Sequence, residues 1–148
     1  MKTNWFNLPP RSLQYSDKWR FWRTISLALV LRLLLKLTSF KSVVRYLKRY
    51  EKPYNGTADL AISTNELKMY RTMLRSSYKF QPLINCLSGS LAFWLTLQRR
   101  GIHTILRFGV LKDGAKLRSH AWLEYNGYPL NPDDDVIQKY QSFAQSIL

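Results

Sequence analysis

The sequence contains a single cysteine, Cys86, among its 148 residues. One cysteine cannot form an intramolecular disulfide, and it cannot build a metal site made of several cysteines. No group of residues has the spacing of metal ligands, so we expect neither a metal nor another cofactor. A reducing, cytosolic location fits this use of cysteine best.

A secretion signal and a convincing membrane span are also lacking. The start, residues 1–5, has neither the apolar core nor the small-residue cleavage site of a secretion signal. The most apolar stretch, Ile25–Leu37, is interrupted by Arg32 and Lys36, whereas a span needs roughly 20 mostly apolar residues. We expect a helix docked on its own core or on a partner, with a spanning helix as an alternative.

Acidic residues are few, and the positive charge is uneven. The net charge is +14, of which residues 1–80 carry +12 and residues 81–148 carry +2. An acidic protein or peptide or an anionic membrane surface would suit the basic half, and Trp19, Phe21 and Trp22 could contact that surface. Nucleic acid is not expected, because the cations are not interleaved with aromatics on a recognisable nucleic-acid fold.

Apolar residues, in contrast, are plentiful. Hydrophobic residues make up 46% of the chain and aromatic residues 14%, which is ample for a packed core. The length is that of one domain, which we expect to be divided in two. Residues 1–80 would form a basic, apolar helical region, and residues 81–148 would form the core that carries the chemistry, with Gln81-Pro82 at the boundary.

The pattern of the N-terminal region is helical. We expect a first helix that starts near Lys18 and a break within residues 39–42 before a second, basic helix. A further helix is expected within residues 57–80. Ser63 and Glu66 have the spacing of a capping box near its start.

The C-terminal region combines one helix with alternating strands. Asn126-Gly127 is a strong signal for a two-residue hairpin turn. The expected elements are a helix over 86–100, strands over 102–111 and 117–125, a return strand over 128–131 and a short helix over 136–143.

Two residues of this region have the types that a cysteine hydrolase needs. Cys86 follows Asn85 and opens the expected helix, where the helix dipole favours a thiolate nucleophile. His120 lies in the second expected strand and suits the role of general base. The Cys86 backbone N–H is a candidate oxyanion donor, and Gln81 is a candidate for a second donor.

The hairpin predicts a third member of the site. A two-residue turn at Asn126-Gly127 pairs Tyr125 with Tyr128, and counting outward brings His120 opposite Asp133. Asp133 is therefore the expected residue that orients the imidazole, with Asn131 as the alternative.

A structural role is the alternative for each of these residues. A lone cysteine is often a small buried hydrophobe, and a strand histidine is often part of the packing. The acidic triplet at 133–135 would also suit a helix start. The joint pattern of helix start, hairpin register and opposing aspartate favours the hydrolase.

The motifs that carry the chemistry resemble those of a known family. They are Cys86-Leu-x-x-Ser90-Leu-Ala, then Arg-Arg-Gly101-Ile, then His120-Ala-Trp122-Leu-Glu124-x-x-Gly127-x-Pro-Leu-Asn131. Over residues 82–143, and more loosely over 19–80, the chain resembles the lasso-peptide biosynthesis leader peptidase in its stand-alone protease form.

The resemblance implies a fold and an activity. The fold is α+β, with N-terminal helices followed by a transglutaminase-like, papain-like core in which the cysteine-bearing helix packs on a small antiparallel sheet. Cys86 would be the nucleophile and His120 the base. The family's third member is an aspartate shortly after the equivalent of Asn131; here Pro132 comes next, and the first aspartate is Asp133.

The implied reaction is removal of the leader from a ribosomally made precursor peptide. The implied partners are that precursor, a separate small leader-binding protein and an ATP-dependent cyclase that closes the macrolactam. Two other functions stay open on the sequence. One is a transglutaminase-type acyl transfer through the same thioester, and the other is a non-enzymatic basic binding protein.

Overall fold

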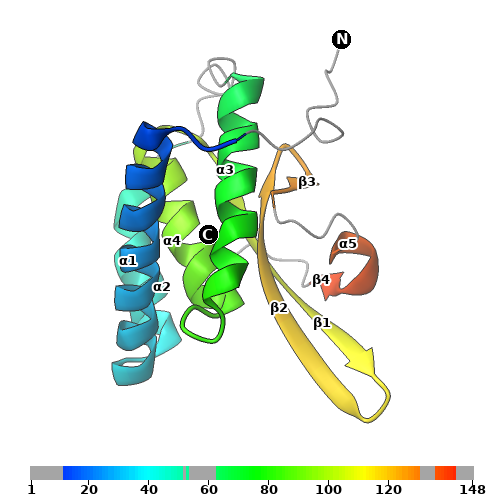
Figure 1. Ribbon diagram of the computed structural model, residues 1–148. Helices are drawn as coiled ribbons and strands as arrows, with labels where there is room; N and C mark the ends of the chain where they lie inside the picture. Colours follow the sequence, from blue (N-terminus) through cyan, green and yellow to red (C-terminus); the bar gives the residue numbers. More distant parts are fainter. Residues whose placement is uncertain (1–11, 52, 54–62, 131–135, 143–148) are drawn as a thin grey trace.

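The computed structural model describes residues 12–51, 53, 63–130 and 136–142 and has the expected α+β architecture. Helices come first and a small antiparallel sheet follows; Figure 1 shows α1–α4 gathered on one side of the β1–β2 hairpin and α5 on the other. The helices are α1 (Tyr15–Leu37), α2 (Phe40–Leu47), α3 (Thr64–Ser77), α4 (Cys86–Arg99) and α5 (Val136–Lys139), with short 3-10 turns η2 (Lys48–Tyr50) and η4 (Tyr78–Phe80). The strands are β1 (Ile105–Asp113), β2 (Lys116–Tyr125), β3 (Tyr128–Pro129) and β4 (Gln141–Ser142).

The first helix starts earlier than the expected position near Lys18. It begins at Tyr15, because the carboxylate of Asp17 accepts a hydrogen bond from the backbone N–H of Gln14 at 3.0 Å. Asp17 lies inside the first turn and satisfies the backbone donor that precedes the helix. The expected break after this helix is confirmed, since α2 starts after Ser39, whose hydroxyl accepts from the Ser42 N–H.

The start of α3 matches the expected capping residue. Ser63 precedes the helix, and its hydroxyl accepts a hydrogen bond from the Glu66 N–H at 3.2 Å. The helix expected within residues 57–80, with its start near Ser63, is therefore confirmed.

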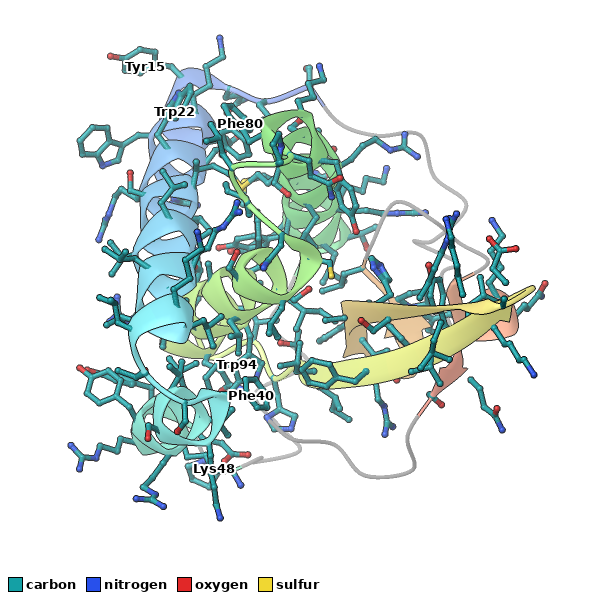
Figure 2. The ribbon with its side chains drawn as sticks, turned by 90° about the horizontal axis from the view of Figure 1, so that it is seen from below. Tyr15, Trp22, Phe40, Lys48, Phe80 and Trp94 are labelled. Carbon is teal, nitrogen blue, oxygen red and sulfur yellow. The ribbon has the colours of Figure 1, made fainter. Side chains whose placement is uncertain are left out.

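One face of α1 packs on the core and the opposite face is exposed. Phe21 is buried, so among the three aromatics considered for membrane contact only Trp19 and Trp22 are exposed. The Trp22 ring also meets Phe80 of η4 with centroids 5.5 Å apart (Figure 2). Among the described helices, none combines the length and apolar character that crossing a membrane requires.

The sheet has the strand order β3-β2-β1-β4, and all neighbours are antiparallel. The predicted hairpin is confirmed: Tyr125 pairs with Tyr128, and the turn residues Asn126 and Gly127 have φ values of 50° and 81°. Positive φ at both positions is what a two-residue hairpin turn of this twist requires.

The end of the described chain differs from expectation. The helix expected over 136–143 stops at Lys139, and Gln141–Ser142 forms a strand that pairs with β1 at Val110 and Gly109. The free edge of β1 explains the difference, because unpaired backbone N–H and C=O groups at a sheet edge gain by pairing with another segment.

A single hydrophobic core joins the helices to the sheet. It includes residues from α1, α2, α3, α4 and the strands, with Tyr70, Phe93, Trp94, Leu106 and Leu123 completely buried. Helix α4 is the centre of this packing, since nearly all of its residues from Ser88 to Gln98 are buried. The core thereby fixes α4 with respect to β2.

Candidate active site

Cys86 is the first residue of α4, as the sequence predicts. The side chain of Asn85 caps the helix by accepting a hydrogen bond from the Ser88 N–H at 2.8 Å. Backbone N–H groups of the first helical turn have no carbonyl partner inside the helix, so the Cys86 N–H is oriented outward from the helix start. The thiol itself is half-buried and is not part of a disulfide.

The segment that leads to Cys86 is held by α1. Arg32 donates a hydrogen bond from its guanidinium to the backbone carbonyl of Pro82, and Ile84 packs into the core. The polar Arg32, which interrupts the apolar run of α1, therefore has a local role in the loop before the helix.

The start of α4 is also tied to β2. The Ser90 hydroxyl, one helical turn beyond Cys86, donates to the backbone carbonyl of Ala121 at 3.1 Å, and both residues are buried. Two residues along the strand, the Leu123 carbonyl accepts from the Leu130 N–H at 2.8 Å. Carbonyls two residues apart point to the same edge of a strand, so α4 meets β2 at its β3 edge, at the residue that follows His120.

His120 lies among aromatic rings on one face of β2. Its ring is stacked on Trp122 with centroids 6.3 Å apart and an angle of 17°, and it lies 5.2 Å from the ring of Tyr140. His120 is partly exposed, whereas its Nε2 atom is shielded from solvent. The Trp122 and Tyr140 rings also meet each other, with centroids 6.4 Å apart, so the three rings form one cluster that restricts the orientation of the imidazole.

Gly109 makes this arrangement of rings possible. Gly109 lies on β1 and pairs with His120 on β2. A Cβ built on Gly109 would lie 2.8 Å from Cη2 of Trp122 and 3.0 Å from Cβ of Tyr140. Only glycine leaves room for both rings over the strand.

A polar network fixes the Trp122 ring from the other side. Trp122 donates from Nε1 to Oε1 of Glu124 at 2.9 Å, and Arg107 donates from Nε to the other carboxylate oxygen at 3.2 Å. Because both Glu124 oxygens have partners, the indole that stacks on His120 has a defined position.

Gln81, the candidate second oxyanion donor, lines a cavity that Cys86 also lines. This cavity has a volume of about 10 Å³, close to the size that one water molecule needs. Asn85, Gly89 and Ser90 contribute further wall. A residue five positions before the cysteine therefore lies near the helix start.

The remaining predicted site residues, Asn131 and Asp133, lie outside the described residues. Two residues that sequence reasoning missed are Gly109 and Tyr140, which surround His120. Glycine inside the β-branched run of β1 was a signal for close approach at that position. Tyr140 had no such signal, because its position depends on the pairing of β4 with β1.

Comparison with known proteins supports the fold. A family model described as the transglutaminase-like superfamily matches residues 26–146, which is more than half of the chain. Searches among curated proteins and among solved structures find no significant match. Proteins of this superfamily are typically cysteine hydrolases or transferases. With a cysteine-bearing helix packed on a curled antiparallel sheet and a family match from α1 to the C-terminal segment, the chain belongs to the transglutaminase-like superfamily.

Proposed function

We propose that this protein is a cysteine peptidase with Cys86 as nucleophile and His120 as general base. The observation that carries the proposal is the hydrogen bond from Ser90 to Ala121, which joins the helix start that bears the thiol to the strand that bears the imidazole. Membership of the transglutaminase-like superfamily supports the same chemistry.

The proposed reaction proceeds through a thioester. His120 takes the thiol proton, and the Cys86 sulfur attacks the scissile carbonyl carbon to form a tetrahedral oxyanion. The Cys86 N–H and the Gln81 side chain would donate to that oxyanion. Collapse breaks the C–N bond, and the imidazolium gives its proton to the leaving amine. Water, activated by His120, then hydrolyses the thioester and restores the thiol.

A third residue is proposed to hold the imidazole. The register observed as far as Leu130, continued along the chain, favours Asp133, with Asn131 as the alternative. A carboxylate beside the histidine would stabilise the imidazolium that forms during attack, and an asparagine would orient the ring without adding charge.

The proposed substrate is the leader region of a ribosomally made lasso-peptide precursor. Support comes from the resemblance of the motifs around Cys86 and His120 to those of the leader peptidase. A separate leader-binding protein and an ATP-dependent cyclase are the proposed partners: the first would present the precursor, and the second would use the freed amine of the core peptide to close the ring.

A processing assay tests the proposal. Precursor and leader-binding protein are co-expressed with wild type, Cys86→Ala, His120→Ala, Asp133→Ala or Asn131→Ala, and products are identified by mass spectrometry. We expect loss of cleavage with the first two variants, and the larger loss of the last two identifies the orienting residue. Ser119→Ala, an exposed change beside His120, is the control. Full cleavage by Cys86→Ala would disprove the peptidase.

Acyl transfer is a second candidate, favoured by the family match. The thioester would be the same, and an amine instead of water would release the acyl group. Mass spectrometry of the same reaction distinguishes the two, since transfer leaves the acyl portion joined to an amine and hydrolysis leaves a free carboxylate.

The leader-binding protein is proposed to dock on the basic surface of α2 and η2. Arg45, Lys48 and Arg49 are exposed there, and Figure 2 labels Lys48 at the outer side of this segment. Reversing these three charges should weaken capture of the partner about tenfold, as expected when attraction becomes repulsion. Reversal of three exposed cations around the β1–β2 turn, Lys112, Lys116 and Arg118, is the matched control. Equal capture by both triple variants in a pull-down would contradict this docking surface.

A further inference from the structure

A second cavity lies at the far end of α4, away from Cys86. It has a volume of about 400 Å³, is open to solvent, and is lined by side chains of α1, α3 and α4. Its walls are made by Arg20, Arg23, Thr24, Leu27, Tyr70, Thr96, Arg99 and Arg100. Four of these residues are arginines, and none is acidic.

The arginines are only partly compensated. Arg100 pairs with Glu66 at 2.8 Å, and Arg99 lies over the Tyr50 ring at 5.3 Å. Among the described residues, Arg20 and Arg23 take part in no ion pair. Like charges gathered around one cavity repel each other. The carboxylates of Glu66 and Asp17, which lie close enough to act on Tyr70, offset part of this charge, and an anionic occupant would offset more of it.

A buried hydroxyl adds a second, independent indication of a ligand. Tyr70 is completely buried, and its hydroxyl has no hydrogen-bond partner among the described residues. Burial raises the pKa of Tyr70 above its ordinary value of 10.0, so the phenol is a neutral donor at physiological pH. A buried donor without an acceptor costs free energy. Tyr70 lines the cavity, so an oxygen of an occupant that reached this hydroxyl would remove that cost.

The chemistry of the walls favours a carboxylate over a phosphate. All lining residues belong to helices or to the helix cap at Arg100, so the cavity offers no cradle of backbone N–H groups. It also lies at the C-terminal end of α4, where the helix dipole disfavours concentrated negative charge. Arginine forks pair well with carboxylates, and Leu27 offers apolar surface for the stem of a glutamate.

The position of the cavity relates it to the candidate active site. Cys86 and Arg99 stand at opposite ends of α4, and thirteen helical residues span about 20 Å. An extended peptide needs about six residues to cover that distance. We propose that the four-arginine cavity binds an acidic segment of the peptide substrate, about six or more residues from the scissile bond, an inference that rests on the proposed peptidase function.

Binding is tested separately from catalysis by using the Cys86→Ala protein. The probe is a fluorescein-labelled tetraglutamate peptide followed by fluorescence anisotropy, with a tetraglutamine peptide as reference. We expect the double change Arg20→Gln and Arg23→Gln to weaken tetraglutamate binding at least about tenfold, as loss of charge-assisted pairs predicts. Tyr70→Phe, which keeps the ring, should weaken binding about threefold through loss of the donor.

The matched control removes two cations from the same helix outside the cavity. Lys18→Gln with Lys36→Gln lowers the net charge equally, and both lysines are exposed. Equal loss of binding in the two double variants would overturn the proposal, because it would show a general attraction between the basic protein and the acidic peptide.

Competition experiments provide a second test. Tighter competition by inorganic phosphate or by a single-stranded oligonucleotide than by unlabelled tetraglutamate would also overturn the proposal. The same double variants are also tested for precursor cleavage in protein that retains Cys86. The cleavage assay tests the peptidase function and the anisotropy assay tests the acidic-segment site, so the failure of either proposal can be told from the failure of the other.

Discussion

The two ends of α4 have different surroundings. At its start, Asn85 caps the helix, Cys86 is half-exposed, and Ser90 reaches the backbone of β2. At its end, Arg99 and Arg100 border a cavity of about 400 Å³, and Gly101 ends the helix with a φ of 78°. The helix between them is almost entirely buried.

In our two proposals, one helix carries a separate site at each end. The dipole of α4 favours an anion at the cysteine end and cations at the arginine end. The buried middle keeps the two ends at a constant separation. Each end is nevertheless completed by other elements: β2 completes the first, and α1 and α3 complete the second.

The largest expected effect concerns the reactivity of Cys86. Because the chain has one cysteine, alkylation by iodoacetamide reports on this thiol alone. His120→Ala should slow alkylation at neutral pH about tenfold or more, since the base that takes the thiol proton is lost. Arg20→Gln with Arg23→Gln, at the other end of α4, should leave the rate unchanged. The alkylation rate is measured from the intact mass of the protein. Equal rates in wild type and His120→Ala would mean that His120 does not activate the Cys86 thiol.

A smaller effect is expected from filling the space that the aromatic rings occupy. Gly109→Ala should lower the free energy of unfolding by about 1–3 kcal/mol, because the new Cβ would overlap Trp122 and crowd Tyr140. Gly89→Ala in α4 is the control. Its Cβ would meet only Ile84 at 3.4 Å, and alanine is the better helix former. Urea denaturation checks both variants, and an unchanged stability of Gly109→Ala would contradict the packing around His120.

The smallest effect compares the two ends of α4 directly. Asn85→Ala removes the cap at the cysteine end, and Gly101→Ala places a Cβ on a residue with positive φ at the arginine end. Each change should cost about 1 kcal/mol of folding stability. Only Asn85→Ala should alter the alkylation rate of Cys86. If Gly101→Ala changed the alkylation rate by the same amount, the stability of the helix alone would control the reactivity of the Cys86 thiol.

Local signals in the sequence predicted much of this architecture. The helix start at Asn85-Cys86, the Ser63–Glu66 spacing and the Asn-Gly turn each act within a few residues, and each is present in the structure. The starts of α3 and α4 and the β2–β3 register were therefore predictable. The division of the chain near residue 80 remains a prediction, as do the roles of Asp133 and Asn131.

Tertiary contacts decided the rest. The start of α1 shifted because Asp17 accepts from Gln14, and the segment after Lys139 became a strand because β1 had an open edge. Neither outcome follows from helical periodicity alone. The rings beside His120 come from Trp122 on the same strand and from Tyr140, which the β4–β1 pairing brings close, so no short stretch of sequence could reveal both.

The sequence by itself determined the residue types of the chemistry and their local settings: one thiol at a helix start, one histidine on a strand, and a strong excess of arginine and lysine. Only the tertiary structure decided that Ser90 would tie this helix to the edge of β2 and that arginines from α1 and α4 would surround one cavity. The physical reason is range. Caps and turns depend on neighbouring residues, whereas a cavity or a site forms only when distant segments bury a common core.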